Sequence, residues 1–235
     1  MSIDLVKIRE RKESVVNLKK ETGLETQKAQ VVLALDYSGS MDHLYRNGTV
    51  QDTVEKILPF GLAFDDNGEV DFYLFENRYK KMPENITVKN LDGYIQDKVI
   101  GKYPMGGTYY SPVLQAIYDE FSPKRGMLGL GKQERMKDPV YVIFITDGEN
   151  SDHGATEDII RDMSRQGFFI QFIGIGNEQF RFLTKLDNLS ARKLDNANFF
   201  SVSNIRNMPD ADLYKSLMAE FPEWTKQARA LNLID

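Results

Sequence analysis

Cysteine is absent from the 235-residue chain, and histidine and tryptophan are scarce, with two residues and one residue respectively. The absence of cysteine excludes disulfides, thiolate metal sites and thiol nucleophiles. No apolar stretch approaches the roughly 20 residues that a membrane-spanning helix needs, so we expect no membrane span. The formal net charge of −5 argues against nucleic acid as the main partner, since a polyanion is bound by basic surfaces.

The N-terminal residues 1–25 are charged throughout and lack the apolar centre of a secretory signal peptide. Hydrophobic residues make up 41% of the chain, which is enough for a substantial core. The length suits one large domain with short additions at its ends. We therefore expect a soluble, cytoplasmic protein.

Apolar runs that alternate with helical patterns predict an α/β fold. Strands with a nearly continuous apolar sequence, separated by helices, are typical of a parallel sheet covered on both faces. The segment 78–90 predicts a further short strand at a sheet edge. The strands are expected at 31–35, 69–75, 139–146, 168–176 and 198–202. The helices are expected at 3–20, 54–63, 111–121, from an N-cap at Thr156 onward, and around 182–186.

This pattern divides the chain into three parts. We expect an N-terminal helix in residues 1–28, the main domain in residues 29–205, and a C-terminal helical extension packed on the domain in residues 206–235. The extension is expected to be a helix broken by Pro222 and followed by a short second helix.

Polar side chains follow the first apolar run, "VVLALDYSGSM", at the point where the strand ends. Asp36, Ser38 and Ser40 are two residues apart, so an extended loop can aim their oxygens at one point. One or two carboxylates with hydroxyls and waters suit Mg²⁺ better than Zn²⁺, which favours nitrogen and sulfur. Asp147 ends a second apolar run in the same way, and ligand sites of open α/β sheets lie beyond such strand ends.

Asp36-x-Ser38-x-Ser40, Thr108 in "GGT" and Asp147 in "TDG" together resemble the metal-ion-dependent adhesion site (MIDAS) of von Willebrand factor A (vWA) domains. The resemblance covers residues 30 to about 205 and implies a Rossmann-like three-layer sandwich. Its mostly parallel central sheet would have one short antiparallel edge strand and helices on both faces. The site residues implied as metal ligands are Asp36, Ser38, Ser40, Thr108 and Asp147.

The resemblance also implies a function. Ser38 and Ser40 would bind Mg²⁺, or Mn²⁺ or Ca²⁺, directly. Asp36 and Asp147 would bind it directly or through water, and Thr108 would join in the ligand-occupied state. The sixth position would accept an acidic residue, Asp or Glu, of a protein partner.

The C-terminal segment and the preceding "FFSVSNI" are similar to the tellurite-resistance (Ter-type) vWA proteins of bacteria. This similarity implies work in a bacterial stress or tellurite-resistance complex. Some members carry a calcium-binding domain upstream. Only some 28 residues precede the first strand here, so we expect that domain to be missing.

Two other functions stay open at this stage. Aspartate at the end of a first parallel strand also describes Mg²⁺-dependent phosphohydrolases of the haloacid-dehalogenase type, with Asp36 as the reactive carboxylate. Those enzymes need a second acid two residues later, where this chain has Ser38. The third possibility is a metal that only stabilises the fold. We expect a binding protein rather than an enzyme.

Several weaker motifs favour simpler explanations. Residues 126–132 match G-x-x-x-x-G-K, but Gln133 replaces the required Ser or Thr and no strand precedes them, so we expect a loop. Gly174 and Gly176 lack the third glycine of a dinucleotide fingerprint and indicate a tight turn. The remaining residues near the metal loops are expected at the surface or rim (His43 and His153), or divided between rim and core (Tyr45, Tyr103, Tyr109 and Tyr110).

Overall fold

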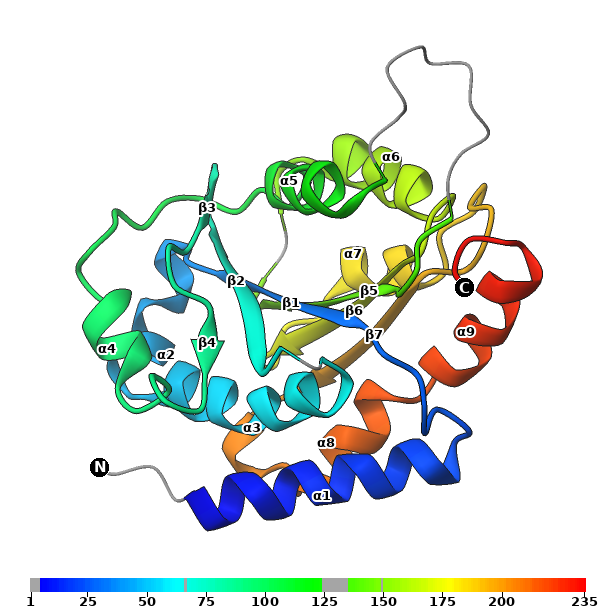
Figure 1. Cartoon of the computed structure of the whole chain (residues 1–235). Helices are drawn as coiled ribbons and strands as arrows, with labels where there is room; N and C mark the ends of the chain where they lie inside the picture. Colours follow the sequence, from blue (N-terminus) through cyan, green and yellow to red (C-terminus); the bar gives the residue numbers. More distant parts are fainter. Residues whose placement is uncertain (1–4, 66, 124–134, 149) are drawn as a thin grey trace.

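The computed structural model describes residues 5–65, 67–123, 135–148 and 150–235 (Figure 1). The loop expected at residues 126–132 lies outside these ranges. Within them, no helix is both long and apolar enough to cross a bilayer.

A central sheet of seven strands forms the middle layer, in the order β3-β2-β1-β5-β6-β7, with β4 also pairing with β2. The five longest strands are parallel to one another, which confirms the α/β prediction. The strands β1, β5 and β6 are buried along almost their whole length, as their apolar runs require, and β2 is exposed only at Glu69. The edge strand β7 is buried only at its first two residues. The strands are β1 Gln30–Asp36, β2 Glu69–Phe75, β3 Tyr79–Lys81, β4 Ile86–Thr87, β5 Val140–Thr146, β6 Phe168–Ile175 and β7 Ala197–Val202.

The direction of strand addition reverses at β1. From β1 the chain passes to β2 on one side and later to β5 on the other, so β1 lies between them. In register, Leu35 pairs with Ile145, so both strands reach the same edge of the sheet together. Ligand sites of open α/β sheets lie at such a reversal, and Asp36 and Asp147 stand at the ends of β1 and β5 there.

The antiparallel edge consists of two short pieces rather than the single strand expected over residues 78–90. β3 pairs with the end of β2, and β4 pairs with its beginning. Pro83 lies between the two pieces, and proline has no N–H to donate to a sheet. The edge is therefore interrupted in its middle.

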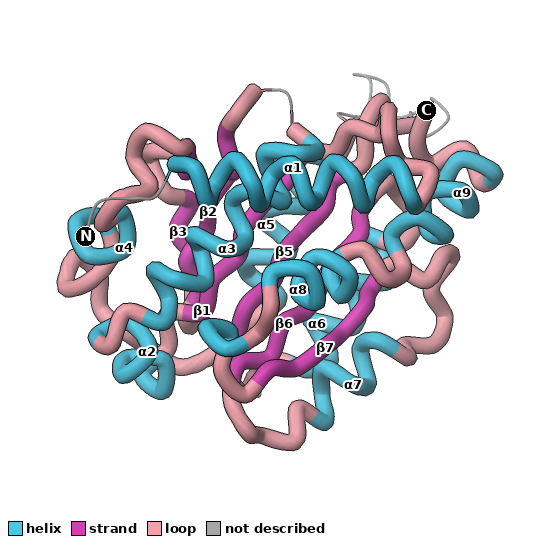
Figure 2. Tube along the Cα trace, turned by 90° about the horizontal axis from the view of Figure 1, so that it is seen from below, coloured by secondary structure: helices cyan, strands magenta, loops and turns pink. Residues whose placement is uncertain are grey.

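Helices cover both faces of the sheet. The helices α5 and α6 lie over one face, and α3 and α8 lie over the other, with α1 outside them (Figures 1 and 2). The helices are α1 Leu5–Glu21, α2 Asp42–Arg46, α3 Thr49–Phe64, α4 Tyr94–Lys98, α5 Ser111–Phe121, α6 His153–Met163, α7 Arg181–Asp187, α8 Asp210–Leu217 and α9 Phe221–Ala230, with 3₁₀ turns at Gly39–Met41 and Ile205–Asn207.

The helix α1 is attached by a buried valine and a buried arginine. Val15 is fully buried. The Arg11 guanidinium pairs with Asp210 at the start of α8, with Nε 2.7 Å from Oδ2, and it also donates to the Glu55 carbonyl on α3 at 3.3 Å. One side chain thus joins α1 to two other helices.

The prediction that Thr156 caps a helix was wrong. Helix α6 begins at His153 and is preceded by Asp152, and Thr156 lies buried within its first turns. The Thr156 hydroxyl is instead contacted by the Asn150 amide at 3.0 Å. At the C-terminus, α8 and α9 form the expected pair of helices, and Pro222 lies in the first turn of α9, where its missing N–H costs nothing.

Candidate metal centre

Strand β1 ends at Asp36, which lies in the protein interior. Its side chain is completely shielded from solvent. One carboxylate oxygen, Oδ1, accepts the backbone N–H of Ser38 at 2.7 Å, and the other, Oδ2, accepts the Thr146 hydroxyl at 2.6 Å. Both oxygens are therefore held in place from within the protein.

Three further oxygens, from Ser38, Ser40 and Asp147, form a hydrogen-bonded row. The Ser38 hydroxyl lies 3.0 Å from the Ser40 hydroxyl, which in turn donates to Oδ1 of Asp147 at 2.8 Å. Ser38 is buried, whereas Ser40 is exposed. The row thus runs from the interior to the surface, and it joins two loops that are 107 residues apart in the sequence.

Backbone hydrogen bonds hold the loop of Thr108 between the other two. The Gly106 carbonyl accepts the Gly39 N–H at 2.9 Å, and the Thr108 carbonyl accepts the Ser151 N–H at 2.9 Å. A Cβ atom at position 106 would collide with the Glu76 carboxylate and with the Asn77 side-chain oxygen, so both side chains would have to move. The three predicted segments therefore meet at one end of the sheet.

A second set of side chains supports these loops. The Asp152 carboxylate accepts the backbone N–H groups of Tyr110 at 3.0 Å and Ser111 at 2.8 Å, which fixes the start of α5 just after Thr108. The Tyr110 hydroxyl donates to the Gly148 carbonyl at 2.5 Å, in the loop of Asp147. These contacts connect the start of α5 to the loop that follows β5.

The two candidate carboxylates differ from Asp152 in their electrostatics. Burial raises the pKa of Asp36 to about 6, although hydrogen bonds from Thr146 and Ser38 oppose this rise. Burial also raises the pKa of Asp147. For Asp152, burial again favours the neutral form, but hydrogen bonds from Ser111 and Tyr110 outweigh it and lower the pKa. A cation beside Asp36 and Asp147 would compensate the cost of burying their charge.

The donor set fits a hard divalent cation. Neighbouring ligands of an octahedral ion at about 2.0–2.1 Å lie about 2.8–3.0 Å apart. The spacings within the row, 3.0 Å for Ser38 to Ser40 and 2.8 Å for Ser40 to Asp147, agree with this geometry. The described residues contain no group of three or more His, Cys, Asp or Glu side chains that could hold a metal ion by themselves. Hydroxyl oxygens would therefore have to complete the coordination.

Sequence reasoning missed Thr146, Tyr110 and Asp152 as supporting residues. Thr146 is a polar residue at the end of an otherwise apolar strand, and this was a usable signal. The tyrosines near the metal loops were expected to divide between rim and core. Of these, Tyr110 is fully buried and Tyr45 is almost fully buried. Both histidines are exposed. The Nδ1 atom of His43 lies 2.9 Å from the Ser40 carbonyl oxygen.

A family model described as the vWA domain found in the TerF C terminus matches residues 28–234. The chain belongs to this vWA-TerF-like family. It is also 34% identical over 226 residues to the uncharacterized protein YcbR of Bacillus subtilis strain 168, a match that covers 95% of this chain and 88% of YcbR. The predicted vWA fold is thereby confirmed.

Solved vWA structures share the fold of this vWA-TerF-like chain. The vWA domain of SpRpn10 superimposes with a TM-score of 0.54 and 12% identity, covering 80% of this chain and 93% of that one. Proximal thread matrix protein 1 from the mussel byssus gives a TM-score of 0.57 and 19% identity over 82% of this chain. This chain spans only 47% of that protein. A further structure of the mussel protein has a zinc-occupied MIDAS motif. It gives a TM-score of 0.52 and 17% identity, covering 82% of this chain and 46% of that one.

Proposed function

We propose that this vWA-TerF-like domain is a metal-dependent protein-binding module. In this proposal, Mg²⁺ bound by Ser38, Ser40, Thr108, Asp36 and Asp147 captures an Asp or Glu side chain of a protein partner. The observation that carries the proposal is the row of Ser38, Ser40 and Asp147 oxygens, whose spacings of 3.0 and 2.8 Å suit one octahedral ion.

The position of the row supports binding of a carboxylate from outside. Its outer member, Ser40, is exposed, so an ion beside it would face solvent on one side. The Asp36 carboxylate is already engaged by Ser38 and Thr146, which favours contact with the ion through water rather than directly. An ion whose charge is only partly neutralised attracts a foreign carboxylate more strongly. Exchange between direct and water-mediated contacts would then adjust the affinity.

The choice of Mg²⁺ rests on ligand chemistry. The mussel protein holds zinc at its MIDAS motif, and a divalent ion of a similar kind is proposed here. Hydroxyl and carboxylate oxygens with remaining waters suit Mg²⁺, with Mn²⁺ or Ca²⁺ as alternatives, better than they suit Zn²⁺.

We propose that the domain is not an enzyme. A phosphohydrolase would use Asp36 as its reactive carboxylate. That side chain is fully buried and both of its oxygens accept hydrogen bonds, so a substrate cannot reach it without rearrangement of the loops. The residue two positions later is Ser38, which cannot act as the required second acid.

The proposed setting is a bacterial stress or tellurite-resistance complex in the cytoplasm. The support for it is the matching family model, which describes the vWA domain found in the TerF C terminus.

The function is tested with immobilised nine-residue peptides that carry Asp or Asn at their centre and random residues other than Asp and Glu elsewhere. Wild-type protein should be retained by the Asp peptides in Mg²⁺ and released by EDTA, and it should ignore the Asn peptides. Ser40→Ala should lose this retention, whereas Ser14→Ala, an exposed serine on α1, should keep it. Equal retention on Asp and Asn peptides, or in Mg²⁺ and EDTA, would overturn the proposal.

A further inference from the structure

A small pocket lies beside the proposed metal centre, between the hairpin that joins β2 to β3 and the segment at Tyr103 and Pro104. Arg78, Tyr79 and Lys80 line it on the hairpin side. Its volume is about 140 Å³. Pockets for small molecules usually measure about 300–1,000 Å³, and a water molecule occupies about 30 Å³ in the liquid. The pocket is therefore sized for a single side chain with some water.

The hairpin touches the loop of Thr108 directly. The Tyr109 N–H donates to the Glu76 carbonyl at 3.0 Å, and the Gly107 N–H donates to the side-chain oxygen of Asn77. Arg78 is the next residue after Asn77. Tyr37, which lies between the proposed ligands Asp36 and Ser38, also lines the pocket, so the pocket adjoins the metal loop. Three residues of an extended peptide span roughly 10 Å, which we take as the reach from the metal to the pocket.

The charge of the pocket is positive in a protein whose net charge is −5. Arg78 and Lys80 contribute two cations and Glu76 one anion, and the Glu76 carboxylate accepts the Asn77 N–H. On the same edge strand, Lys81 pairs with Asp71 at 3.1 Å. Within the ranges that the structure describes, no carboxylate pairs with Arg78 or Lys80.

The geometry also orients one of these cations. The Lys80 ammonium lies 4.5 Å from the centre of the Tyr103 ring, so the ring holds the lysine beside the pocket without neutralising it. Arg78 is exposed and presents a guanidinium that can bind a carboxylate through two parallel hydrogen bonds.

We propose that this pocket, here called the Arg78 pocket, binds a second carboxylate of the same partner segment, within three residues of the acid that binds the metal. The inference rests on the proposed function and specifies its partner: an acidic segment with two closely spaced Asp or Glu side chains. The metal captures one acid and the Arg78 pocket selects for the other.

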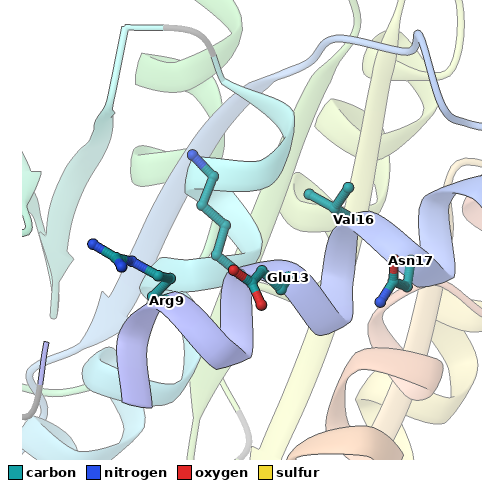
Figure 3. Close-up of a pocket in the computed structure, with 5 residues that line it drawn as sticks. Arg9, Glu13, Val16 and Asn17 are labelled. Carbon is teal, nitrogen blue, oxygen red and sulfur yellow. The ribbon is translucent and has the colours of Figure 1, made fainter. Parts of the chain in front are cut away.

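A hollow along α1 offers a control surface. Figure 3 shows Arg9, Glu13, Val16 and Asn17 along this helix, and with Lys12 they line a cavity of about 390 Å³. All of its lining residues come from one helix. Arg9 and Lys12 are exposed cations on the outer layer, beyond α3 and α8 (Figure 1). The variant Arg9→Gln/Lys12→Gln therefore matches the charge change of Arg78→Gln/Lys80→Gln at a distant place.

The test uses the peptides with a central Asp and fixes a second position, one to three residues away, as Asp, Asn, Lys or Tyr. In Mg²⁺, wild-type protein should bind the best second-Asp peptides about three- to tenfold more tightly than their Asn counterparts. Arg78→Gln/Lys80→Gln should lose this preference but still require Mg²⁺ and the central Asp. The α1 double variant should behave as the wild type.

Each remaining outcome has a defined meaning. Mg²⁺-dependent binding of the central Asp without preference at any second position, or with preference for Tyr, would overturn the Arg78 pocket and leave the proposed function standing. A preference that persists in Arg78→Gln/Lys80→Gln would also overturn it. Binding that ignores Mg²⁺ and the central Asp would overturn both.

Discussion

The buried carboxylate of Asp36 should weaken the metal-free protein, and Asp36→Asn should therefore stabilise it. Asparagine keeps the shape of the side chain and an oxygen for the Ser38 N–H, and its amide can donate to the Thr146 hydroxyl. It carries no charge that burial must desolvate. The substitution removes a metal ligand and a cost to folding at the same time.

The magnitude follows from the pKa of Asp36. Burial raises this pKa from 3.8 to about 6. One pKa unit corresponds to about 1.4 kcal/mol, so the cost at pH 7 is on the order of 3 kcal/mol. Below pH 3.8 the carboxyl is protonated in both the folded and the unfolded chain, and the cost vanishes. As the pH rises from 3.8 to about 6, the unfolded chain ionises first and the folded state loses stability.

Thermal unfolding in EDTA measures this effect. For a chain of this length, about 3 kcal/mol corresponds to a rise in Tm of roughly 6–12 °C for Asp36→Asn at pH 7, shrinking toward zero near pH 4. Excess Mg²⁺ should raise the Tm of the wild type but not of Asp36→Asn.

Asp152→Asn provides the control for this prediction, since hydrogen bonds from Ser111 and Tyr110 outweigh burial and lower the pKa of that carboxyl. Its ionised form stabilises the fold at neutral pH, and this contribution is lost as the pH falls through the lowered pKa. Asp152→Asn should therefore lower the Tm at pH 7. An Asp36→Asn variant that melts below the wild type in EDTA, or a difference that does not change between pH 4 and 7, would refute the reasoning.

Three further predictions concern the same centre. Mg²⁺ affinity, measured by calorimetry, should fall as the pH drops through about 6, because protons compete with the metal for Asp36; a flat profile down to about pH 5 would contradict this. Tyr110→Phe should lower the free energy of unfolding by about 1–3 kcal/mol, since the Gly148 carbonyl loses its donor, and denaturant titration should detect it; an unchanged midpoint would speak against this contact. Gly106→Ala should weaken Mg²⁺ binding, because its methyl group would displace the Asn77 hairpin from the Thr108 loop. If calorimetry finds an unchanged Mg²⁺ affinity, this contact does not position the metal centre.

The sequence predicted the central strands well because they are buried on both faces and therefore carry continuous apolar runs. The runs ending at Asp36 and Asp147 also marked the correct edge of the sheet. Thr156 was misjudged as a cap because the helix begins three residues earlier, at His153. The local pattern does not show that the preceding Asp152 binds the start of α5 rather than its own helix.

The Arg78 pocket was not predictable from local sequence. It exists because the hairpin at Asn77 meets the loop of Gly107, 30 residues further along the chain. The different partners of two neighbouring lysines also depend on tertiary packing. Lys81 pairs with Asp71, whereas Lys80 faces the ring of Tyr103. Contacts of this kind arise from tertiary packing and have no corresponding motif in the local sequence.

A crystal structure grown with Mn²⁺ and an Asp-containing peptide would test the central claim most directly. The account predicts one anomalous peak within bonding distance of the Ser38 and Ser40 hydroxyls, with Thr108 and Asp147 turned toward it and a peptide carboxylate completing the coordination. Mn²⁺ elsewhere, or a Thr108 side chain directed away from the two serines with the peptide bound, would contradict it.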